Sequence, residues 1–246
     1  MSLPIVFINL ARDQDRRHRM EVALAQAGLH AERLEAVWWN YLPADAQARL
    51  YSSALNQRQY HQPLVNGEKG CYASHLLAWQ NLLDGSASAM VILEDDVRLT
   101  DQFAPVIQAI EKLEPAWDMV KLIGRPREKI RARQPLTDQT QLIEYQRIPS
   151  MTAGYVISRS GATKLLAARM PFGRPIDVDL RFWWECDLRI LGVMPPALVL
   201  DETSFVSSIG EKHAATTASH RWRKFRMKLA LTLGNAWHSR SSRAVK

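Results

Sequence analysis

Cysteine is scarce in this sequence, which contains only Cys71 and Cys186 among its 246 residues. Neither belongs to a Cys-x-x-Cys pair, so neither a disulfide framework nor a structural zinc site is expected. Two isolated cysteines are typical of free thiols in a reducing compartment.

Long apolar runs are missing as well, since no stretch approaches the roughly 20 apolar residues of a membrane-spanning helix. Residues 1–9, Met-Ser-Leu-Pro-Ile-Val-Phe-Ile-Asn, lack a basic n-region and predict a first strand in place of a secretory signal. The sequence contains no internal repeat and no Gly-rich phosphate loop of the P-loop kind. We therefore expect a soluble globular protein whose phosphate chemistry, if any, uses other residues.

Acidic residues are rare at the C-terminal end. Residues 211–246 contain nine lysines and arginines and a single acid, Glu211, whereas residues 1–210 contain 23 basic and 24 acidic residues. This division predicts a nearly neutral domain, residues 1–210, followed by a basic tail, residues 211–246. The formal net charge of +7 belongs to the tail and does not predict nucleic-acid binding.

Within the tail, residues 220–233 have the pattern of a helix. Trp222, Phe225, Leu229 and Leu233 recur at helical spacing and have basic residues around them. A basic amphipathic helix with aromatic residues is typical of an anionic membrane surface. The alternative is a helix docked on the domain with a solvated basic side.

The central feature of the chain is residues 89–97, Ala-Met-Val-Ile-Leu-Glu-Asp-Asp-Val. An uninterrupted apolar run favours a strand buried on both faces of a parallel or mixed α/β sheet. Three acids at its end repel one another and resist desolvation, and a divalent cation relieves both costs. The alternative is a polar turn after a strand. Because open α/β sheets bind ligands at the carboxyl ends of their strands, a metal site is plausible chemistry here.

Two further segments carry expectations about structure. Residues 125–141 are basic and lack a period, which predicts a disordered or mobile functional loop. A helix is expected from about Asp177 to Gly192, and its acids and aromatics suit either sugar binding or an amphipathic helix with acids near its N-terminus. These residues are Asp177, Asp179, Phe182, Trp183, Trp184, Glu185 and Asp187.

Five blocks of the sequence, in order, resemble glycosyltransferase family 25, the bacterial lipooligosaccharide galactosyltransferases and their relatives. They are residues 8–17 (Ile-Asn-Leu-Ala-Arg-Asp-Gln-Asp-Arg-Arg), 67–75 (Gly-Glu-Lys-Gly-Cys-Tyr-Ala-Ser-His), 91–97 (Val-Ile-Leu-Glu-Asp-Asp-Val), 153–158 (Ala-Gly-Tyr-Val-Ile-Ser) and 175–177 (Pro-Ile-Asp). The resemblance departs from the family pattern at residues 36–39, where Ala-Val-Trp-Trp stands in place of the usual Ala-Val-Asp-Gly. Two bulky tryptophans put the donor pocket there in question.

The resemblance implies a GT-A-type α/β fold with a central mixed sheet flanked by helices. It also implies a UDP-sugar donor, most often UDP-galactose, and a divalent metal, Mn²⁺ or Mg²⁺. Transferred residue by residue, it assigns donor binding to Asn9, Leu10, Arg12, Arg16, Glu94 and Asp95. It assigns the metal to Asp96 and Glu94, with His213 as a further candidate ligand.

The resulting hypothesis is an inverting transfer of a sugar to a glycan or glycolipid acceptor such as lipooligosaccharide. Galactose is the leading candidate for that sugar. A carboxylate outside the metal cluster would deprotonate the acceptor hydroxyl, with Asp177 first and Asp179 second as candidates. With the basic tail, this suits a cytoplasmic enzyme peripheral to the inner face of the cytoplasmic membrane. Two alternatives stay open: a nucleotidyl- or phosphoryl-transfer enzyme on a similar sheet, and a non-catalytic membrane-associated binding protein.

Overall fold

The computed structural model describes residues 3–114, 116–125, 127–201 and 218–241, and these form a mixed α/β structure. Its largest sheet has the strand order β2-β1-β3-β8-β5-β9-β7-β6 in the described part of the chain. The strands are β1 Ile5–Asn9, β2 Glu32–Glu35, β3 Ala89–Glu94, β5 Met119–Lys121, β6 Ile130–Pro135, β7 Gln141–Tyr145, β8 Gly154–Ser158 and β9 Ile190–Met194. A separate antiparallel pair joins β4 Val97–Leu99 to β10 Leu198–Leu200.

Strand directions in the large sheet are mixed, as expected. β1 runs parallel to both β2 and β3, and β5 runs parallel to β9. β8 is antiparallel to both β3 and β5, and β7 is antiparallel to both β6 and β9. Ile8 pairs with Glu94, so the carboxyl ends of β1 and β3 meet at one edge of the sheet.

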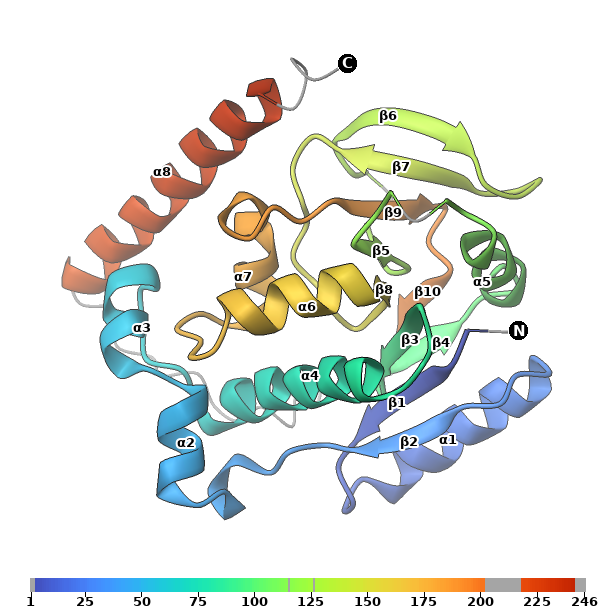
Figure 1. Ribbon diagram of the computed structural model, residues 1–246, viewed down its shortest axis with the longest axis horizontal. Helices are drawn as coiled ribbons and strands as arrows, with labels where there is room; N and C mark the ends of the chain where they lie inside the picture. The colour runs from blue at the N-terminus through green and yellow to red at the C-terminus, as the bar shows by residue number, and fades with distance from the viewer. Residues whose placement is uncertain (1–2, 115, 126, 202–217, 242–246) are drawn as a thin grey trace.

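Helices cover both faces of the sheet (Figure 1). On one face, α4 Asn66–Asp84, α6 Arg159–Ala168, α7 Ile176–Asp179 and the 3₁₀ helix η2 Leu180–Glu185 build one core. On the other face, α1 Gln14–Gln26 and α5 Phe103–Glu111 build a second core. The short helices η1 Trp39–Tyr41, α2 Ala44–Leu50 and α3 Ser53–Gln59 lie between β2 and α4 in the chain.

Strand β3 is buried on both faces, as its unbroken apolar sequence predicted. Met90 and Ile92 belong to the core under α4, whereas Ala89, Val91 and Leu93 belong to the core under α1 and α5. Successive side chains of a strand point to opposite faces, so a strand with a helix layer on each side is apolar at every position.

Two expectations about local structure were wrong. Residues 125–141 do not form a mobile loop, because β6 lies within them and pairs with β7 as a hairpin. The expected helix from Asp177 to Gly192 ends at Glu185, and β9 begins at Ile190. Strand β6 is exposed and carries arginines in place of an apolar period, so its sequence contains no strand signal. The expected helix is broken early because Phe182 interrupts the helical backbone with φ −91° and ψ 43°.

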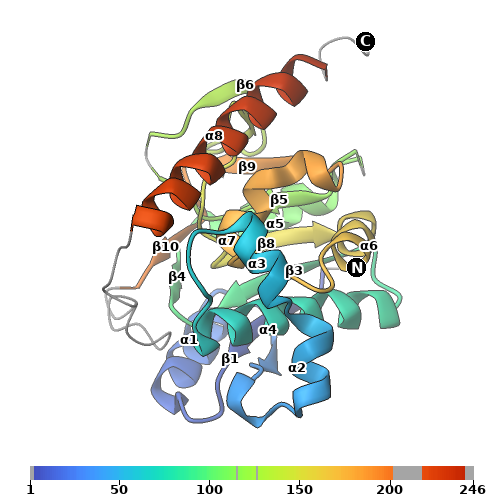
Figure 2. The same ribbon diagram turned by 90° about the vertical axis from the view of Figure 1, so that its left-hand side faces the viewer.

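Within the basic tail, the described residues form α8, Ala218–Ser241, which is longer than the expected helix over residues 220–233. It lies along one side of the molecule, against η2 (Figures 1 and 2). None of the helices in the described residues combines the length and apolar character needed to cross a bilayer.

Candidate active site

A pocket of about 350 Å³ opens where β1 and β3 end. Its wall includes Leu10 and Arg16 from the chain after β1 and the acidic triplet Glu94, Asp95 and Asp96 from the end of β3. The opposite wall is formed by Trp38 and Trp39 and by the first turns of α4. The carboxyl ends of two parallel strands thus bring together segments that are about 80 residues apart in the sequence.

Asn9 lies beneath the pocket and does not line it. Its side chain is 1% exposed and donates from Nδ2 to Asp95 Oδ2 (2.7 Å) and to the Asp13 carbonyl (3.0 Å). Arg33 Nε donates to Asn9 Oδ1 at 2.9 Å, and Arg16 Nη1 donates to Asp95 Oδ1 at 3.3 Å. Both Asp95 oxygens therefore have a donor, and Asn9 acts on the site by holding Asp95 in place.

Asp96 differs from Asp95, because its Oδ1 atom is buried and has no hydrogen-bond donor within the described residues. Burial, together with the charges of Glu94 and Asp95, raises the pKa of Asp96 to about 7. A buried carboxylate oxygen without a donor, beside two other acids, suits a hard divalent cation such as Mn²⁺ or Mg²⁺. These acids therefore fit a divalent cation, and Asp96 and Glu94 are the residues that would hold it.

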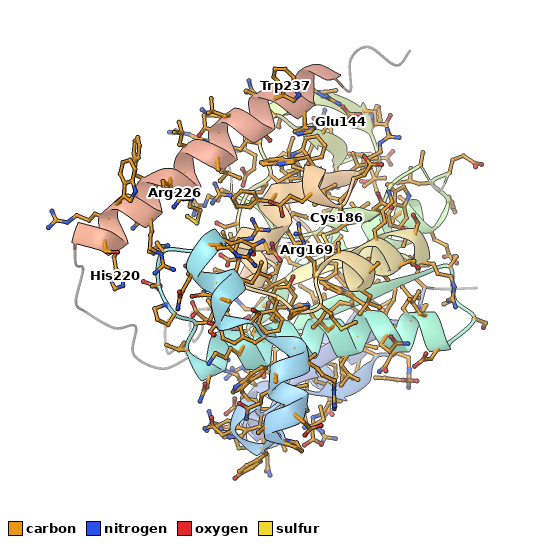
Figure 3. The ribbon with its side chains drawn as sticks, turned by 60° about the vertical axis from the view of Figure 1, so that its left-hand side comes forward. Glu144, Arg169, Cys186, His220, Arg226 and Trp237 are labelled. Carbon is orange, nitrogen blue, oxygen red and sulfur yellow. The ribbon has the colours of Figure 1, made fainter. Side chains whose placement is uncertain are left out.

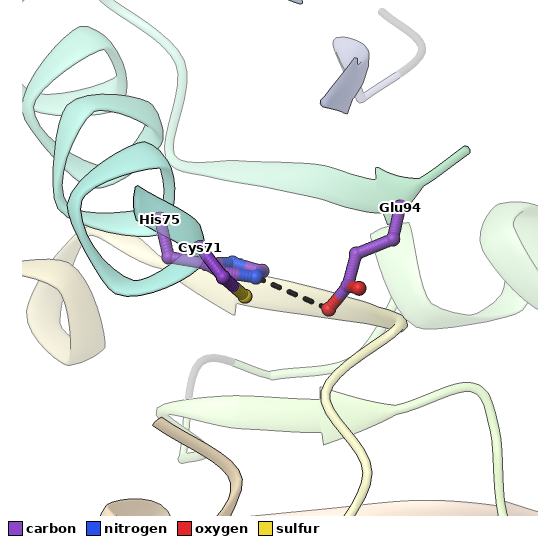
Figure 4. Close-up of side chains that lie close together, drawn as sticks. All are labelled: Cys71, His75 and Glu94. Atoms are coloured by element: carbon purple, nitrogen blue, oxygen red, sulfur yellow. Dashed lines mark hydrogen bonds and ion pairs between the residues drawn. The ribbon is translucent and has the colours of Figure 1, made fainter. Parts of the chain in front are cut away.

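Glu94 is held from behind by a chain of buried hydrogen bonds. Trp79 Nε1 donates to the Tyr155 hydroxyl at 2.8 Å, and that hydroxyl lies 2.8 Å from His75 Nδ1. Burial raises the pKa of Tyr155, so the hydroxyl stays protonated and donates a hydrogen bond to His75 Nδ1. His75 Nε2 then carries the imidazole proton and donates to Glu94 Oε1 at 3.3 Å (Figure 4).

Cys71 lies beside His75 and Glu94, and the ligand-type atoms of the three residues lie within 4.8 Å of one another (Figure 4). Burial and the charge of Glu94 raise the pKa of the Cys71 thiol, so the sulfur is protonated. A thiolate site would select a soft ion such as Zn²⁺ over Mn²⁺ or Mg²⁺. The hydrogen bonds of His75 give this group a simpler role, which is to orient Glu94.

The tryptophan pair is a wall of the pocket. Trp39 is 4% exposed and packs edge-on against Tyr51 and Phe172. Trp38 has an extended backbone, with φ −84° and ψ 101°, and the guanidinium of Arg12 lies 4.0 Å from the centre of its ring. The departure from the family pattern at these positions therefore adds an aromatic surface to the pocket without strained backbone.

Helix α4 holds this wall in place through Gly70 and Ser74. A Cβ atom on Gly70 would lie 2.6 Å from the Val37 carbonyl oxygen, so only glycine permits the approach. Ser74 Oγ accepts a hydrogen bond from Val37 N at 2.8 Å. The segment preceding Trp38 is thereby fixed against the helix that also carries Cys71 and His75.

Asp177 is half-buried at the first turn of α7, and α7 packs against α4. Burial raises the pKa of Asp177, and the charge of Glu94 adds to this, while Lys121 opposes it. Lys121 is 1% exposed, and burial lowers its pKa to about 7. Its Nζ donates to the Pro149 carbonyl at 2.8 Å. Asp177 lies outside the wall of the pocket but close enough for Glu94 to act on it electrostatically.

Asp179 has a different environment, although it is only two residues further on. It is 3% exposed and accepts hydrogen bonds from the Tyr72 hydroxyl (2.6 Å) and from Arg174 Nε (2.7 Å). Arg169 adds an ion pair at 3.5 Å. Both carboxylate oxygens are engaged in the core, which favours Asp177 over Asp179 as the base.

Comparison with known proteins bears on this site. The sequence profile of "Glycosyltransferase family 25 (LPS biosynthesis protein)" matches residues 2–180. The chain belongs to glycosyltransferase family 25. The match covers the pocket, the acidic triplet and Asp177, whereas His213 lies outside both the match and the described residues.

Individual family 25 relatives are similar over the same part of the chain. Human procollagen galactosyltransferase 2 is 31% identical over 182 residues, which cover 71% of this chain and 29% of the human protein. Procollagen galactosyltransferase 1-B of Xenopus laevis is 32% identical over 187 residues, covering 73% and 30% of the two chains. A Bos taurus protein named "Probable inactive glycosyltransferase 25 family member 3" is 29% identical over 184 residues, covering 71% and 30%. This chain therefore matches less than a third of each of these relatives.

Some residues of the family 25 pocket carried no assigned role at the sequence level. Cys71, Ser74 and His75 lie within one of the matched blocks, and the spacing of Cys71 and His75 by four places them on one face of a helix. The helical spacing could therefore be read from the sequence. The pairing of His75 with Tyr155 could not, because the two residues are 80 positions apart.

Proposed function

We propose that this chain is a metal-dependent, inverting glycosyltransferase of the GT-A type that uses a UDP-sugar donor. The observation that carries the proposal is the buried oxygen of Asp96, which has no hydrogen-bond donor among the described residues, in a pocket also lined by Asp13, Glu94 and Asp95. A divalent cation held by Asp96 and Glu94, with His213 as a further candidate, would neutralise charge on the departing diphosphate.

The chain's own residues supply the remaining parts of a donor site. Trp38 lines the pocket and offers an aromatic face for the nucleobase, while the Arg12 guanidinium, which does not line the pocket, lies 4.0 Å from the centre of that ring. Arg16 lies beside the acidic triplet and would contact phosphate oxygens while pairing with Asp95. Leu10 lies in the pocket wall near them, and Asn9 acts through Asp95.

For the acceptor, Asp177 is the proposed general base. Its raised pKa makes it a better proton acceptor than an exposed carboxylate, and a base must lie within hydrogen-bond reach of the attacking hydroxyl. Attack from the face opposite the diphosphate would invert the anomeric centre. Galactose is the first sugar to test, because the relatives are named galactosyltransferases, and the acceptor class is a glycan, as part of a lipooligosaccharide or another glycolipid.

The test is a donor screen on the intact chain. Thermal unfolding is followed with UDP, CTP or ATP, each with and without Mn²⁺, and UDP release is then measured across UDP-sugars. UDP with Mn²⁺ at about 100 times its Kd should raise the free energy of unfolding by about 2.7 kcal/mol. Asp96→Ala should abolish the part of this stabilisation that depends on Mn²⁺. The control is Asp101→Ala, because Asp101 is an exposed acid outside the pocket.

Each rival has its own outcome in the same screen. A preference for ATP or CTP over UDP would point to nucleotidyl or phosphoryl transfer. Tight UDP binding with no UDP release from any sugar, with or without a glycan acceptor, would point to a non-catalytic binding protein. The bovine relative whose name begins "Probable inactive" is the reason to measure turnover as well as binding.

A further inference from the structure

Helix α8 is docked on the protein through one face. Leu231 is 2% exposed, and the Trp183 indole nitrogen donates to Asn235 Oδ1 at 3.1 Å. A Cβ atom on Gly234 would lie 2.3 Å from the Trp184 ring, and the His238 ring stacks on that indole with 5.7 Å between centroids. These contacts fix which side of α8 faces outward.

The outward side is apolar, which is unusual for a docked helix. The exposed fractions are 61% for Trp222, 55% for Phe225, 45% for Leu229, 60% for Leu233 and 73% for Trp237. Their spacings of three or four residues place them in one stripe, roughly 22 Å long at 1.5 Å per residue. A helix that buries one face normally presents a polar one to solvent. Figure 3 shows α8 at the edge of the molecule, with Trp237 near one end.

Cations flank this stripe. Arg221, Lys224, Arg226 and Lys228 are exposed, and the helix contains no aspartate or glutamate along its length. Arg223, by contrast, turns inward and donates to the Tyr60 carbonyl at 2.7 Å. The outer face of α8 is thus a continuous apolar strip with positive charge beside it.

We propose that the outer face of α8, Trp222, Phe225, Leu229, Leu233 and Trp237 with their flanking cations, binds an anionic lipid surface. The helix lies parallel to the surface, its apolar stripe enters the boundary between head groups and acyl chains, and its cations contact anionic head groups. A second copy of the chain is a poorer occupant, because a two-fold contact would bring this cationic patch against itself. The inference goes beyond the proposed function and holds whichever reaction the pocket performs.

The experiment is flotation of the full chain with vesicles of phosphatidylcholine, with and without phosphatidylglycerol. Binding is expected only with the anionic lipid and should weaken as salt is raised. Phe225→Ser/Leu229→Ser should weaken binding by at least about tenfold, because two apolar side chains lose their burial in lipid. Arg226→Gln/Lys228→Gln should weaken binding by about fivefold per charge removed.

The matched control is Val22→Ser/Leu77→Ser, which removes two apolar side chains that are each 39% exposed, on α1 and α4. It should bind vesicles as the wild type does. Thermal unfolding should stay cooperative in all three variants, and the control, whose side chains are less exposed, should lose at least as much stability as Phe225→Ser/Leu229→Ser. Equal binding by the Phe225→Ser/Leu229→Ser variant, or no binding by the wild type, would overturn the proposal. Self-association that this variant abolishes, without vesicle binding by the wild type, would assign the face to a second copy and also overturn it.

Discussion

At the scale of single residues, two acids of one short segment have opposite environments. Asp177 is half-buried near Lys121 and Glu94, whereas Asp179 is fully engaged by Tyr72, Arg169 and Arg174. About half a turn of helix separates a candidate base from a structural ion cluster. The sequence ranked Asp177 first because it lies in a matched family block outside the acidic triplet, and the tertiary contacts add an independent reason for that order.

Replacing Asp177 by asparagine should therefore affect activity, whereas replacing Asp179 should affect stability. Asp177→Asn should abolish sugar transfer while leaving UDP binding and stability nearly unchanged. Asp179→Asn should lower the free energy of unfolding by about 3 kcal/mol, because Arg169 and Arg174 lose a buried counter-charge. Transfer assays, UDP titration and urea unfolding of both variants measure this. Loss of UDP binding in Asp177→Asn would make that residue a donor contact or a structural one.

Lys121 predicts a pH dependence of stability. Its pKa is lowered to about 7 in the folded protein, by burial first, against 10.5 for an unperturbed lysine. Between these values the unfolded chain binds more protons than the folded one, so the stability should rise as the pH goes from about 7 towards about 10. Below about pH 7 the cost of charging the buried amine is present in full.

Urea unfolding at several pH values in that window is the measurement. Lys121→Met should flatten the rise, while Lys112→Met, at an exposed lysine, should leave it as in the wild type. An unchanged slope in Lys121→Met would mean that Lys121 titrates normally in the folded protein.

At the scale of elements, α4 connects the pocket wall to the acidic triplet Glu94, Asp95 and Asp96. Gly70 and Ser74 hold the segment before Trp38, and His75 holds Glu94. Residues 67–75 thus form a block because five of them, Gly67, Gly70, Cys71, Ser74 and His75, line one pocket.

Gly70→Ala should separate these two functions of α4. The added methyl would lie 2.6 Å from the Val37 carbonyl oxygen, so the wall must move. We expect a loss of about 1–3 kcal/mol in stability and weaker UDP binding, read by thermal unfolding with and without UDP. Gly85→Ala is the control, because its Cβ would meet its nearest atom at 3.5 Å. Unchanged UDP binding in Gly70→Ala would show that this wall does not contact the nucleotide.

At the scale of the whole molecule, α8 is part of the folded structure. It contacts α3, η2 and the segment around Gln146, through Arg223, Asn235 and Leu231 among others. Deleting residues 218–246 to test membrane binding would therefore also damage the fold.

Such a deletion should lower Tm by about 5 °C, because burial of a leucine alone contributes roughly 2 kcal/mol. Calorimetry or thermal circular dichroism measures this, and a truncation after Ser241 is the control. If the protein without residues 218–246 has the same Tm as the intact chain, α8 is not docked in solution.

Local pattern by itself determined much of this protein. The apolar run of residues 89–94 predicted a strand buried on both faces, and the heptad-like apolar spacing after residue 220 predicted a helix, because both signals depend only on side-chain periodicity. The family blocks then indicated the edge of the sheet at which the acids meet. Strand β6 was missed because it is exposed and carries no apolar period. Strand β9 was missed for another reason, since the start of its apolar run, Ile190–Met194, was assigned to the end of the expected helix.

Tertiary structure alone decided which atoms have partners. Asp95 and Asp96 are adjacent in sequence, yet Asn9 and Arg16 satisfy the first, and an oxygen of the second lacks a donor in the described residues. His75 is oriented by a tyrosine 80 residues away, and the exposed stripe of α8 is defined by which other face is docked. Pairing across long sequence separations and the orientation of a helix on its support are set by packing, which local sequence does not encode.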